Sequence, residues 1–180
     1  MEETLRIRGI LFFGLKFILW LIVAFVLWWW LIPYYGHGLG WLALKSLNGI
    51  FGMDFSEYSV HPQGWLNIDT MLSFDQRLMM PLSMLTKNYP TYLALILATG
   101  GLGLWRRARV ILYGSLIIML GHLMYLVLAL RFAQSIQESP EIPTALAEFF
   151  MIIPFILWVA FAYWDKIMAY ISETAGEESE

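Results

Sequence analysis

The chain has 180 residues, of which 59% are hydrophobic and 14% are charged, and its formal net charge is −3. Soluble domains carry about 25% charged residues, so this composition excludes an ordinary soluble globule and indicates a membrane protein. No run of basic residues suggests binding of nucleic acid. The chain has no cysteine, which excludes disulfides, thiolate metal sites and a cysteine nucleophile.

The first apolar segment, residues 10–31, contains Lys16 as its charged residue. A helix of this length extends about 33 Å, which is enough for a hydrocarbon core of about 30 Å. The segment is therefore predicted to be the first transmembrane helix. It is too long for a signal peptide and lacks a small-residue cleavage site after it, so no cleavable signal is expected. Lys16 is expected to reach the headgroups with its long side chain.

Aromatic residues cluster at the end of this segment. Trp and Tyr concentrate at the headgroup level, because their rings are apolar while their N–H or O–H groups hydrogen-bond with water. Pro33 and Gly36 are predicted to end the helix there. We interpret the cluster as a lipid-interface anchor; a stacking platform for a ligand is the alternative. Its members are Trp28, Trp29, Trp30, Tyr34 and Tyr35.

Residues 38–51 form an apolar segment that is too short to cross a bilayer. Its apolar residues share one helical face, and Lys45, Asn48 and Gly49 lie opposite. This pattern predicts an amphipathic helix in the plane of the membrane interface. The apolar face comprises Leu39, Leu42, Ala43, Leu47, Ile50 and Phe51.

Residues 53–87 are the most polar part of the chain. Residues 58–60 and 65–74 are predicted to be two strands, since apolar and polar residues alternate in the second of them. The sequence HPQG at 61–64 suits a turn, with proline second and glycine fourth. Because an isolated hairpin is marginal in water, we expect it to pack on the interfacial helix, on more of this loop or on a partner.

Further apolar segments at 89–105, 111–130 and 149–171 are predicted to be the remaining spans. Glycines at 100, 101 and 103 indicate either close helix packing or a frayed terminus at the end of the second span. Pro154 is expected to kink the fourth span. The acidic tail, residues 172–180, is predicted to be disordered.

Basic residues predict the orientation of the chain. The side that carries the N-terminal arginines and Arg106, Arg107 and Arg109 is expected to be cytoplasmic, where the three arginines contact anionic lipid headgroups. Residues 33–88 then lie outside, which in a bacterium is the periplasm. The predicted fold is an all-α inner-membrane protein, a single membrane domain over residues 1–180. It has four transmembrane helices with both termini cytoplasmic, a small periplasmic β-hairpin and an interfacial helix.

His122 lies near the middle of the third span. An ionisable group at that depth suggests a function, because burying it costs free energy. A neutral histidine costs less there than a charge, and it can hydrogen-bond to a neighbouring helix. The structural interpretation is favoured; contact with a ligand or partner, and a catalytic or metal role, are the alternatives. A metal site would need further ligands on facing helices, and the other spans offer none.

The outer segment contains His61, Asp75 and Arg77. A histidine with carboxylates can support acid–base chemistry or metal binding, but no spacing here matches a known ligand pattern. Asp75 and Arg77 are expected to form a local polar cap after the second strand. Ser59 or Ser73 as a nucleophile has no supporting motif. We therefore expect no metal and no cofactor.

A family resemblance rests on two stretches. Residues 89–130 read YPTYLALILATGGLGLWRRARVILYGSLIIMLGHLMYLVLAL, and the outer segment reads EYSVHPQGWLNIDTML. Over residues 10–135 this pattern of hydropathy and turns resembles the small membrane proteins associated with exosortase H. Such proteins are expected to accompany an exosortase, a membrane transpeptidase that processes proteins with a C-terminal sorting signal. Exosortases resemble sortases in using Cys, Arg and His. Because this chain has no cysteine, the resemblance implies an accessory role, with no catalytic residues carried over.

The favoured hypothesis is a non-enzymatic scaffold subunit that contacts membrane lipids and a larger membrane-protein partner. The predicted partner contacts are Trp65, Ile68, Leu72 and Phe74, because edge strands readily pair with another chain. The alternative is a membrane enzyme acting on a lipid or peptide at the periplasmic leaflet. A transporter is less favoured, since its spans would carry polar or broken helices at the midplane.

Overall fold

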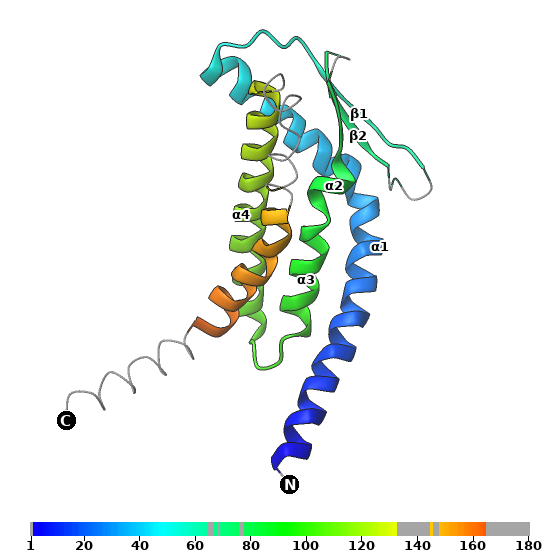
Figure 1. Cartoon of the computed structure of the whole chain (residues 1–180), viewed down its shortest axis with the longest axis vertical. Coiled ribbons are helices and arrows are strands. Elements are labelled where there is room, and N and C mark those ends of the chain that lie inside the picture. The colour runs from blue at the N-terminus through cyan, green and yellow to red at the C-terminus, as the bar shows by residue number, and fades with distance from the viewer. Residues whose placement is uncertain are drawn as a thin grey trace, which may run out of the picture.

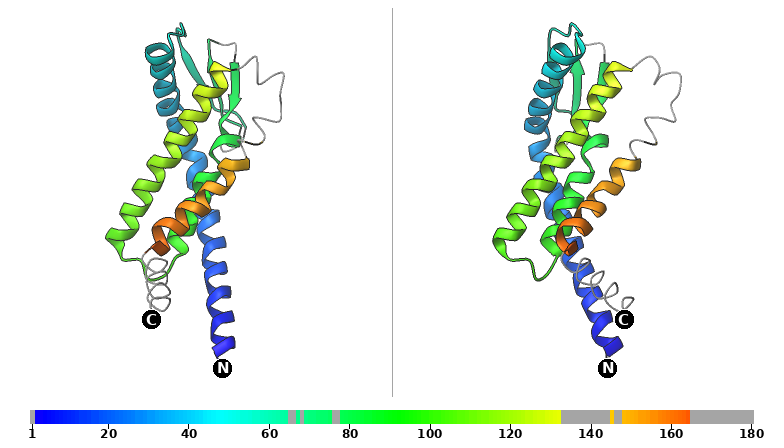
Figure 2. Two further views of the ribbon diagram at one scale, coloured as in Figure 1. Left: turned by 60° about the vertical axis from the view of Figure 1, so that its left-hand side comes forward. Right: turned by 90° about the vertical axis from the view of Figure 1, so that its left-hand side faces the viewer.

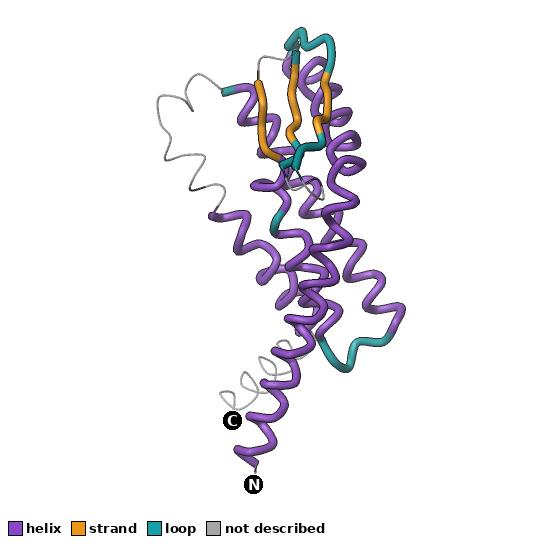
Figure 3. Tube along the Cα trace, turned by 90° about the vertical axis from the view of Figure 1, so that its right-hand side faces the viewer, coloured by secondary structure: helices purple, strands orange, loops and turns teal. Residues whose placement is uncertain are grey.

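The structure of the chain is a computed structural model, which describes residues 2–64, 67, 69–75, 78–132, 145 and 148–164. Helices dominate it, and a small antiparallel sheet lies at one end of the helices (Figures 1 and 3). A mostly helical chain with a small β element is therefore confirmed. The elements are α1 (Glu2–Phe51), β1 (Tyr58–His61), β2 (Met71–Phe74), β3 (Leu78–Pro81), α2 (Leu82–Thr86), α3 (Asn88–Ala98), α4 (Leu104–Arg131) and the helical segment Glu148–Trp164.

Helix α1 continues for 50 residues, so the prediction that Pro33 and Gly36 end a first helix is wrong. Proline removes one backbone N–H, and it bends a helix when the surrounding packing supports the next turn. Helix α1 changes direction near its middle (Figure 1). A Cβ at Gly36 would lie 2.5 Å from Leu82 Cδ1, and one at Gly40 would lie 2.6 Å from Tyr58 Cδ2. These glycines therefore let the sheet and α2 approach α1.

The second half of α1 is covered by protein on its apolar face. Leu39, Ala43 and Leu47 are buried, and they belong to a core that includes residues of the sheet and of the last turns of α4. The separate interfacial helix predicted over 38–51 is thus wrong in two respects: it belongs to α1, and the sheet and α4 bury Leu39, Ala43 and Leu47 of its apolar face, whereas Ile50 and Phe51 at its end are exposed. Periodicity identifies such a face but does not identify what covers it.

The sheet has the strand order β1-β2-β3, with both pairings antiparallel and Tyr58 opposite Phe74. The pairing of the predicted hairpin is present, but the sequence did not predict β3. Strand β2 begins only at Met71, and Asn67, within the predicted strand, has a φ of 58° that an extended strand does not permit. The connection from β1 to β2 is therefore longer than the predicted four-residue turn.

The sheet has one apolar face, which packs on the helices, and one polar face. Successive side chains of a strand point to opposite faces, so a register slip by one residue would turn polar groups into the core. Burial of the apolar face therefore determines the register. The core-facing residues are Tyr58, Val60, Leu72 and Phe74, and those on the opposite face include Ser59, His61 and Ser73.

Helix α3 is shorter than the second predicted span: it has 11 residues and ends at Ala98. Thr99 is extended, and Gly101 has a φ of +79°, a conformation that favours glycine. A Cβ added at Gly100, Gly101 or Gly103 would meet nothing within 4 Å, so these glycines form a connection and not a close helix contact. Helix α4 then begins at Leu104, which brings the predicted arginine cluster into its first turns.

Within the described part of the chain, two helices are long and apolar enough to cross a membrane, one over Gly9–Phe51 and the other α4. Glu148–Trp164 is a shorter apolar helix, and α3 is too short by itself, so the four predicted spans reduce to two candidates by length and composition. Contiguous exposed apolar surface marks contact with lipid or with protein. Here it includes Ile10, Leu11, Leu15, Ile18 and Leu19 of α1, and Leu112, Leu116 and Leu120 of α4.

Candidate functional site

Helical elements from distant parts of the chain meet at a network of polar groups inside the bundle. His122 of α4 has no exposed surface; its Nδ1 lies 2.7 Å from Tyr35 Oη of α1, and its Nε2 lies 3.0 Å from Asn88 Oδ1 of α3. Asn88 Nδ2 donates to the backbone carbonyl of Phe150 at 3.2 Å. We name Tyr35, His122, Asn88 and the Phe150 carbonyl the polar network. It joins α1, α3, α4 and Glu148–Trp164 through three side chains and one backbone carbonyl.

A proline leaves the last carbonyl of the polar network open. In a regular helix the Phe150 carbonyl accepts from the N–H of residue 154, but Pro154 has no N–H. A carbonyl only accepts, so Asn88 turns its NH₂ toward Phe150 and its Oδ1 toward His122. The His122 Nε2 therefore donates, and the Nδ1 of the neutral ring accepts from the Tyr35 hydroxyl. The direction of each hydrogen bond thus follows from one missing donor.

The predicted aromatic cluster is divided between the interior and the surface. Trp28 is only 5% exposed; its Nε1 donates to Thr86 Oγ1 at 3.2 Å, and its ring stacks on Tyr89 with centroids 4.3 Å apart. Tyr35, half-buried, belongs to the polar network. Consecutive helical residues point about 100° apart, so three consecutive tryptophans cannot share one environment. The interface position predicted for Trp28 is therefore wrong.

Trp30 and Tyr34 point away from the bundle, with 68% and 76% of their surfaces exposed, and Trp29 is half-buried. They follow the exposed aliphatic residues of the first half of α1. A role of these three side chains at the lipid interface stays a prediction.

The predicted arginine cluster surrounds the junction of α3 and α4. Arg107 Nη2 donates to the carbonyl of Thr99, the C-cap residue of α3, at 2.9 Å. Trp158 Nε1 donates to Thr99 Oγ1 at 2.8 Å, so Glu148–Trp164 closes the same junction. Arg106 is half-buried and Arg109 is exposed. Arg107 thus stabilises a helix end, and contact of the cluster with headgroups stays a prediction.

The polar face of the sheet carries a second cluster. Ser59 Oγ lies 2.9 Å from His61 Nε2 and 2.7 Å from Ser73 Oγ, and His61 Nε2 lies 3.2 Å from Ser73 Oγ. Ser59 and His61 are two residues apart on β1, and Ser73 faces Ser59 across the pairing with β2, so all three lie on one face. His61 is exposed and Ser73 is buried.

Asp75 follows β2 in a left-handed conformation with a φ of 46°. Its Oδ1 accepts from the backbone N–H groups of Ser56 and Glu57 and from the Ser56 hydroxyl, at 2.8–3.0 Å. The carboxylate therefore holds the chain that enters β1 beside the end of β2. Arg77, expected beside it, lies outside the described residues.

Two of the four predicted partner contacts are inaccessible. Leu72 and Phe74 are 0% and 1% exposed, because the apolar face of β2 packs on the helices. As contacts for another chain they are therefore wrong. Trp65 and Ile68 lie outside the described residues.

Both ring nitrogens of His122 hydrogen-bond to neighbouring helices, as the structural interpretation of this residue predicts. In the described part of the chain, no three His, Asp or Glu side chains form a group that could hold a metal ion. Sequence reasoning missed Asn88 as the partner of His122. Pro154 was the available signal, because a proline inside a span leaves a carbonyl that another group must satisfy.

Comparison with curated proteins and with solved structures gives no match. The family model of the exosortase H-associated membrane proteins matches residues 8–148. The matched residues include most of α1, the sheet, α3 and α4, and therefore Tyr35, Asn88 and His122 of the polar network. This confirms the resemblance drawn from the apolar and outer segments, and we conclude that the chain belongs to the exosortase H-associated membrane protein family.

Proposed function

We propose that the chain is a non-enzymatic accessory subunit of a bacterial inner-membrane complex linked to exosortase-type protein sorting. Membership of the exosortase H-associated family is the observation that carries the proposal. The sheet seated on apolar helices supports a scaffolding mechanism, in which the helices hold a folded surface at the outer side of the membrane. In this arrangement both termini are cytoplasmic and the sheet is periplasmic.

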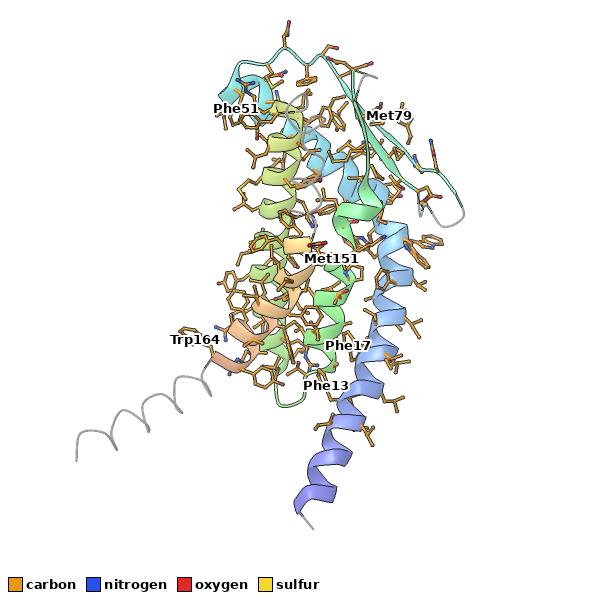
Figure 4. All side chains as sticks on the ribbon, in the orientation of Figure 1. Phe13, Phe17, Phe51, Met79, Met151 and Trp164 are labelled. Atoms are coloured by element: carbon orange, nitrogen blue, oxygen red, sulfur yellow. The ribbon has the colours of Figure 1, made fainter. Side chains whose placement is uncertain are left out.

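The positions of the helix ends support this orientation. The N-terminal end of α1 and Trp164 lie toward the end of the molecule opposite the sheet (Figures 1 and 4). Arg106, Arg107 and Arg109 lie in the first turns of α4, and this end of α4 also lies away from the sheet (Figure 1). An excess of Arg and Lys marks the cytoplasmic side, so we place the sheet in the periplasm.

Edge strands of the sheet supply the proposed partner contact. The Leu82 N–H donates to the Thr70 carbonyl. Because hydrogen-bonded and non-hydrogen-bonded pairs alternate along an antiparallel ladder, the other residues of β3 that bond to β2 are Leu78 and Met80. The N–H and C=O of Met79 therefore point to the outer edge of β3, away from β2. Pro81 occupies the other outward position, where its missing N–H costs no ladder bond. Met79 is 62% exposed and projects from the sheet (Figure 4).

The polar network and Asp75 have structural roles that explain them without catalysis. His122 is bonded through both nitrogens, and Asp75 binds the backbone before β1. These contacts support a scaffold more than an enzyme that uses either residue.

The test is co-purification of the tagged chain, in mild detergent, with an exosortase expressed beside it. We expect the pair to be recovered together and Met79→Pro to reduce the recovered enzyme, because proline removes the outward donor without breaking a ladder bond. Met79→Ala keeps that donor and serves as the matched control. Isolation of the chain without the enzyme would overturn the proposal. Equal recovery with Met79→Pro would exclude this edge of the sheet as the contact.

The cluster of Ser59, His61 and Ser73 favours a second candidate, an acyl-transfer enzyme acting at the periplasmic leaflet. A hydroxyl 2.9 Å from an imidazole nitrogen is the geometry of a serine activated by a general base. Ser59→Ala and His61→Ala would each abolish sorting in cells if the chain were such an enzyme. A scaffold would tolerate both changes and respond to Met79→Pro.

A further inference from the structure

Helix α1 is much longer than a bilayer is thick. Its 50 residues extend about 75 Å, against about 30 Å of hydrocarbon and 40–45 Å with both headgroup layers. The first half carries exposed aliphatic residues, including Leu19, Val23 and Leu27. The second half must therefore lie in a different environment from the first.

One exposed face runs along both halves of α1 and changes in composition at Trp30. From Leu19 to Leu27 its exposed residues are aliphatic. From Trp30 onward the face carries exposed aromatic and basic residues at intervals of three or four, which is the spacing of a single helical face. They are Trp30, Tyr34, His37, Trp41 and Lys45. We name these five residues the headgroup face.

The opposite side of α1 is not available to lipid. Ile32, Leu39, Ala43 and Leu47 are buried in the core below the sheet. The headgroup face is thus the side of this half-helix that remains open. The predicted interfacial helix would have its aliphatic face against the membrane. In the structure the exposed face of this half-helix is instead the aromatic and cationic one.

We propose that the headgroup face binds the outer leaflet of the membrane, with the aromatic rings at the headgroup level and the Lys45 ammonium on lipid phosphate. Trp41 is 52% exposed, and Trp and Tyr rings favour this layer. A lysine beside them adds attraction to anionic lipid. The aliphatic residues that precede Trp30 on the same face place its lower end at the hydrocarbon boundary.

This placement requires an inclined helix. The stretch from Trp30 to Lys45 is about 22 Å long, whereas one headgroup layer is about 5–8 Å thick. The stretch fits the layer only when the second half of α1 lies at a shallow angle to the membrane surface. The change of direction near the middle of α1 permits this (Figure 1). His37 also contacts Tyr58 of β1, with ring centroids 6.1 Å apart, so the headgroup face sets the height of the sheet.

The absence of native cysteine permits a direct depth measurement by spin labelling. Trp41→Cys and Tyr34→Cys are labelled in lipid nanodiscs, with Leu19→Cys as the hydrocarbon reference and Met79→Cys as the aqueous reference. We expect the labels at 34 and 41 to lie within about 5–8 Å of the phosphate level, shallower than the label at 19. A label at 41 as accessible to a water-soluble relaxant as the label at 79 would overturn the proposal.

The charge on Lys45 is tested in nanodiscs of phosphatidylglycerol. Lys45→Glu is expected to raise the water accessibility of the label at 41, and Glu57→Gln, outside the headgroup face, is the control. Unchanged accessibility with Lys45→Glu would overturn the phosphate contact. The nanodiscs contain only this chain and lipid, so the result is independent of whether an exosortase binds.

Discussion

At the residue scale, buried polar side chains in the bundle hydrogen-bond to groups on neighbouring helices. His122 inside an apolar helix would be costly alone, and its two bonds join it to α1 and α3. Tyr89 Oη donates to Ser115 Oγ at 2.8 Å, and Tyr92 Oη donates to the Val110 carbonyl at 2.6 Å, so the neighbouring phenols follow the same rule. The polar groups here bind helices to one another.

Replacement of His122 by Phe is therefore expected to destabilise the protein. The phenyl ring fills the volume of the imidazole but leaves the Tyr35 hydroxyl and the Asn88 oxygen without this hydrogen-bond partner. Each buried polar group left unsatisfied lowers the free energy of unfolding by about 1–3 kcal/mol. Thermal unfolding in detergent measures the change. Met124→Ala, at an exposed position of α4, is the control. A variant that unfolds like the wild type but abolishes sorting would show that His122 acts through function and not through stability.

At the element scale, a backbone carbonyl that lacks its helical donor accepts a hydrogen bond from a side chain of another helix. Pro154 opens the Phe150 carbonyl, and Asn88 at the start of α3 supplies the donor. Figure 2 shows Glu148–Trp164 running beside α3 and α4. Gly121 allows this contact, since a Cβ there would lie 2.7 Å from the Phe150 ring.

Asn88 and Pro154 are accordingly expected to be energetically coupled. Pro154→Ala restores an internal N–H for the Phe150 carbonyl, so Asn88→Leu should cost less in that background than in the wild type. Interhelical hydrogen bonds in membranes contribute about 0.6 kcal/mol on average and up to about 1.7 kcal/mol, which sets the expected coupling. A double-mutant cycle of unfolding free energies measures it. Strictly additive costs would contradict the proposed bond.

Gly114 of α4 packs directly against Tyr92 of α3. A Cβ there would collide with the Tyr92 hydroxyl and ring. We expect Gly114→Ala to destabilise the protein by about 1–3 kcal/mol through overpacking, and Tyr92→Phe to relieve part of the clash at the hydroxyl. Gly14→Ala is the control, because a Cβ there would meet nothing within 4 Å. Equal melting temperatures for the two alanine variants would disprove the contact.

At the scale of the whole molecule, the sheet and the arginine-bearing first turns of α4 lie at opposite ends of the helices (Figure 1). In the proposed orientation these ends lie on opposite sides of the inner membrane. The outer edge of β3 then faces the periplasm, and the α3–α4 connection faces the cytoplasm.

Cysteine labelling in spheroplasts tests this orientation. Met79→Cys should react with an impermeant maleimide added outside, because Met79 is exposed at the sheet. Ala108→Cys, exposed beside the arginines, should react only after the membrane is permeabilised. The reverse pattern would invert the topology and move the sheet to the cytoplasm.

The amino-acid sequence by itself determined the class of protein, the apolar segments, the two paired strands and the family. These follow from composition, from periodicity and from local order along the chain. Which face of each helix packs inside the protein was decided only by the tertiary structure. Trp28 meets Thr86 across 58 residues, and Tyr35 meets His122 across 87 residues. A periodic pattern shows that a face is apolar, but lipid, sheet and neighbouring helix can all cover such a face, and the choice depends on which distant segment packs there.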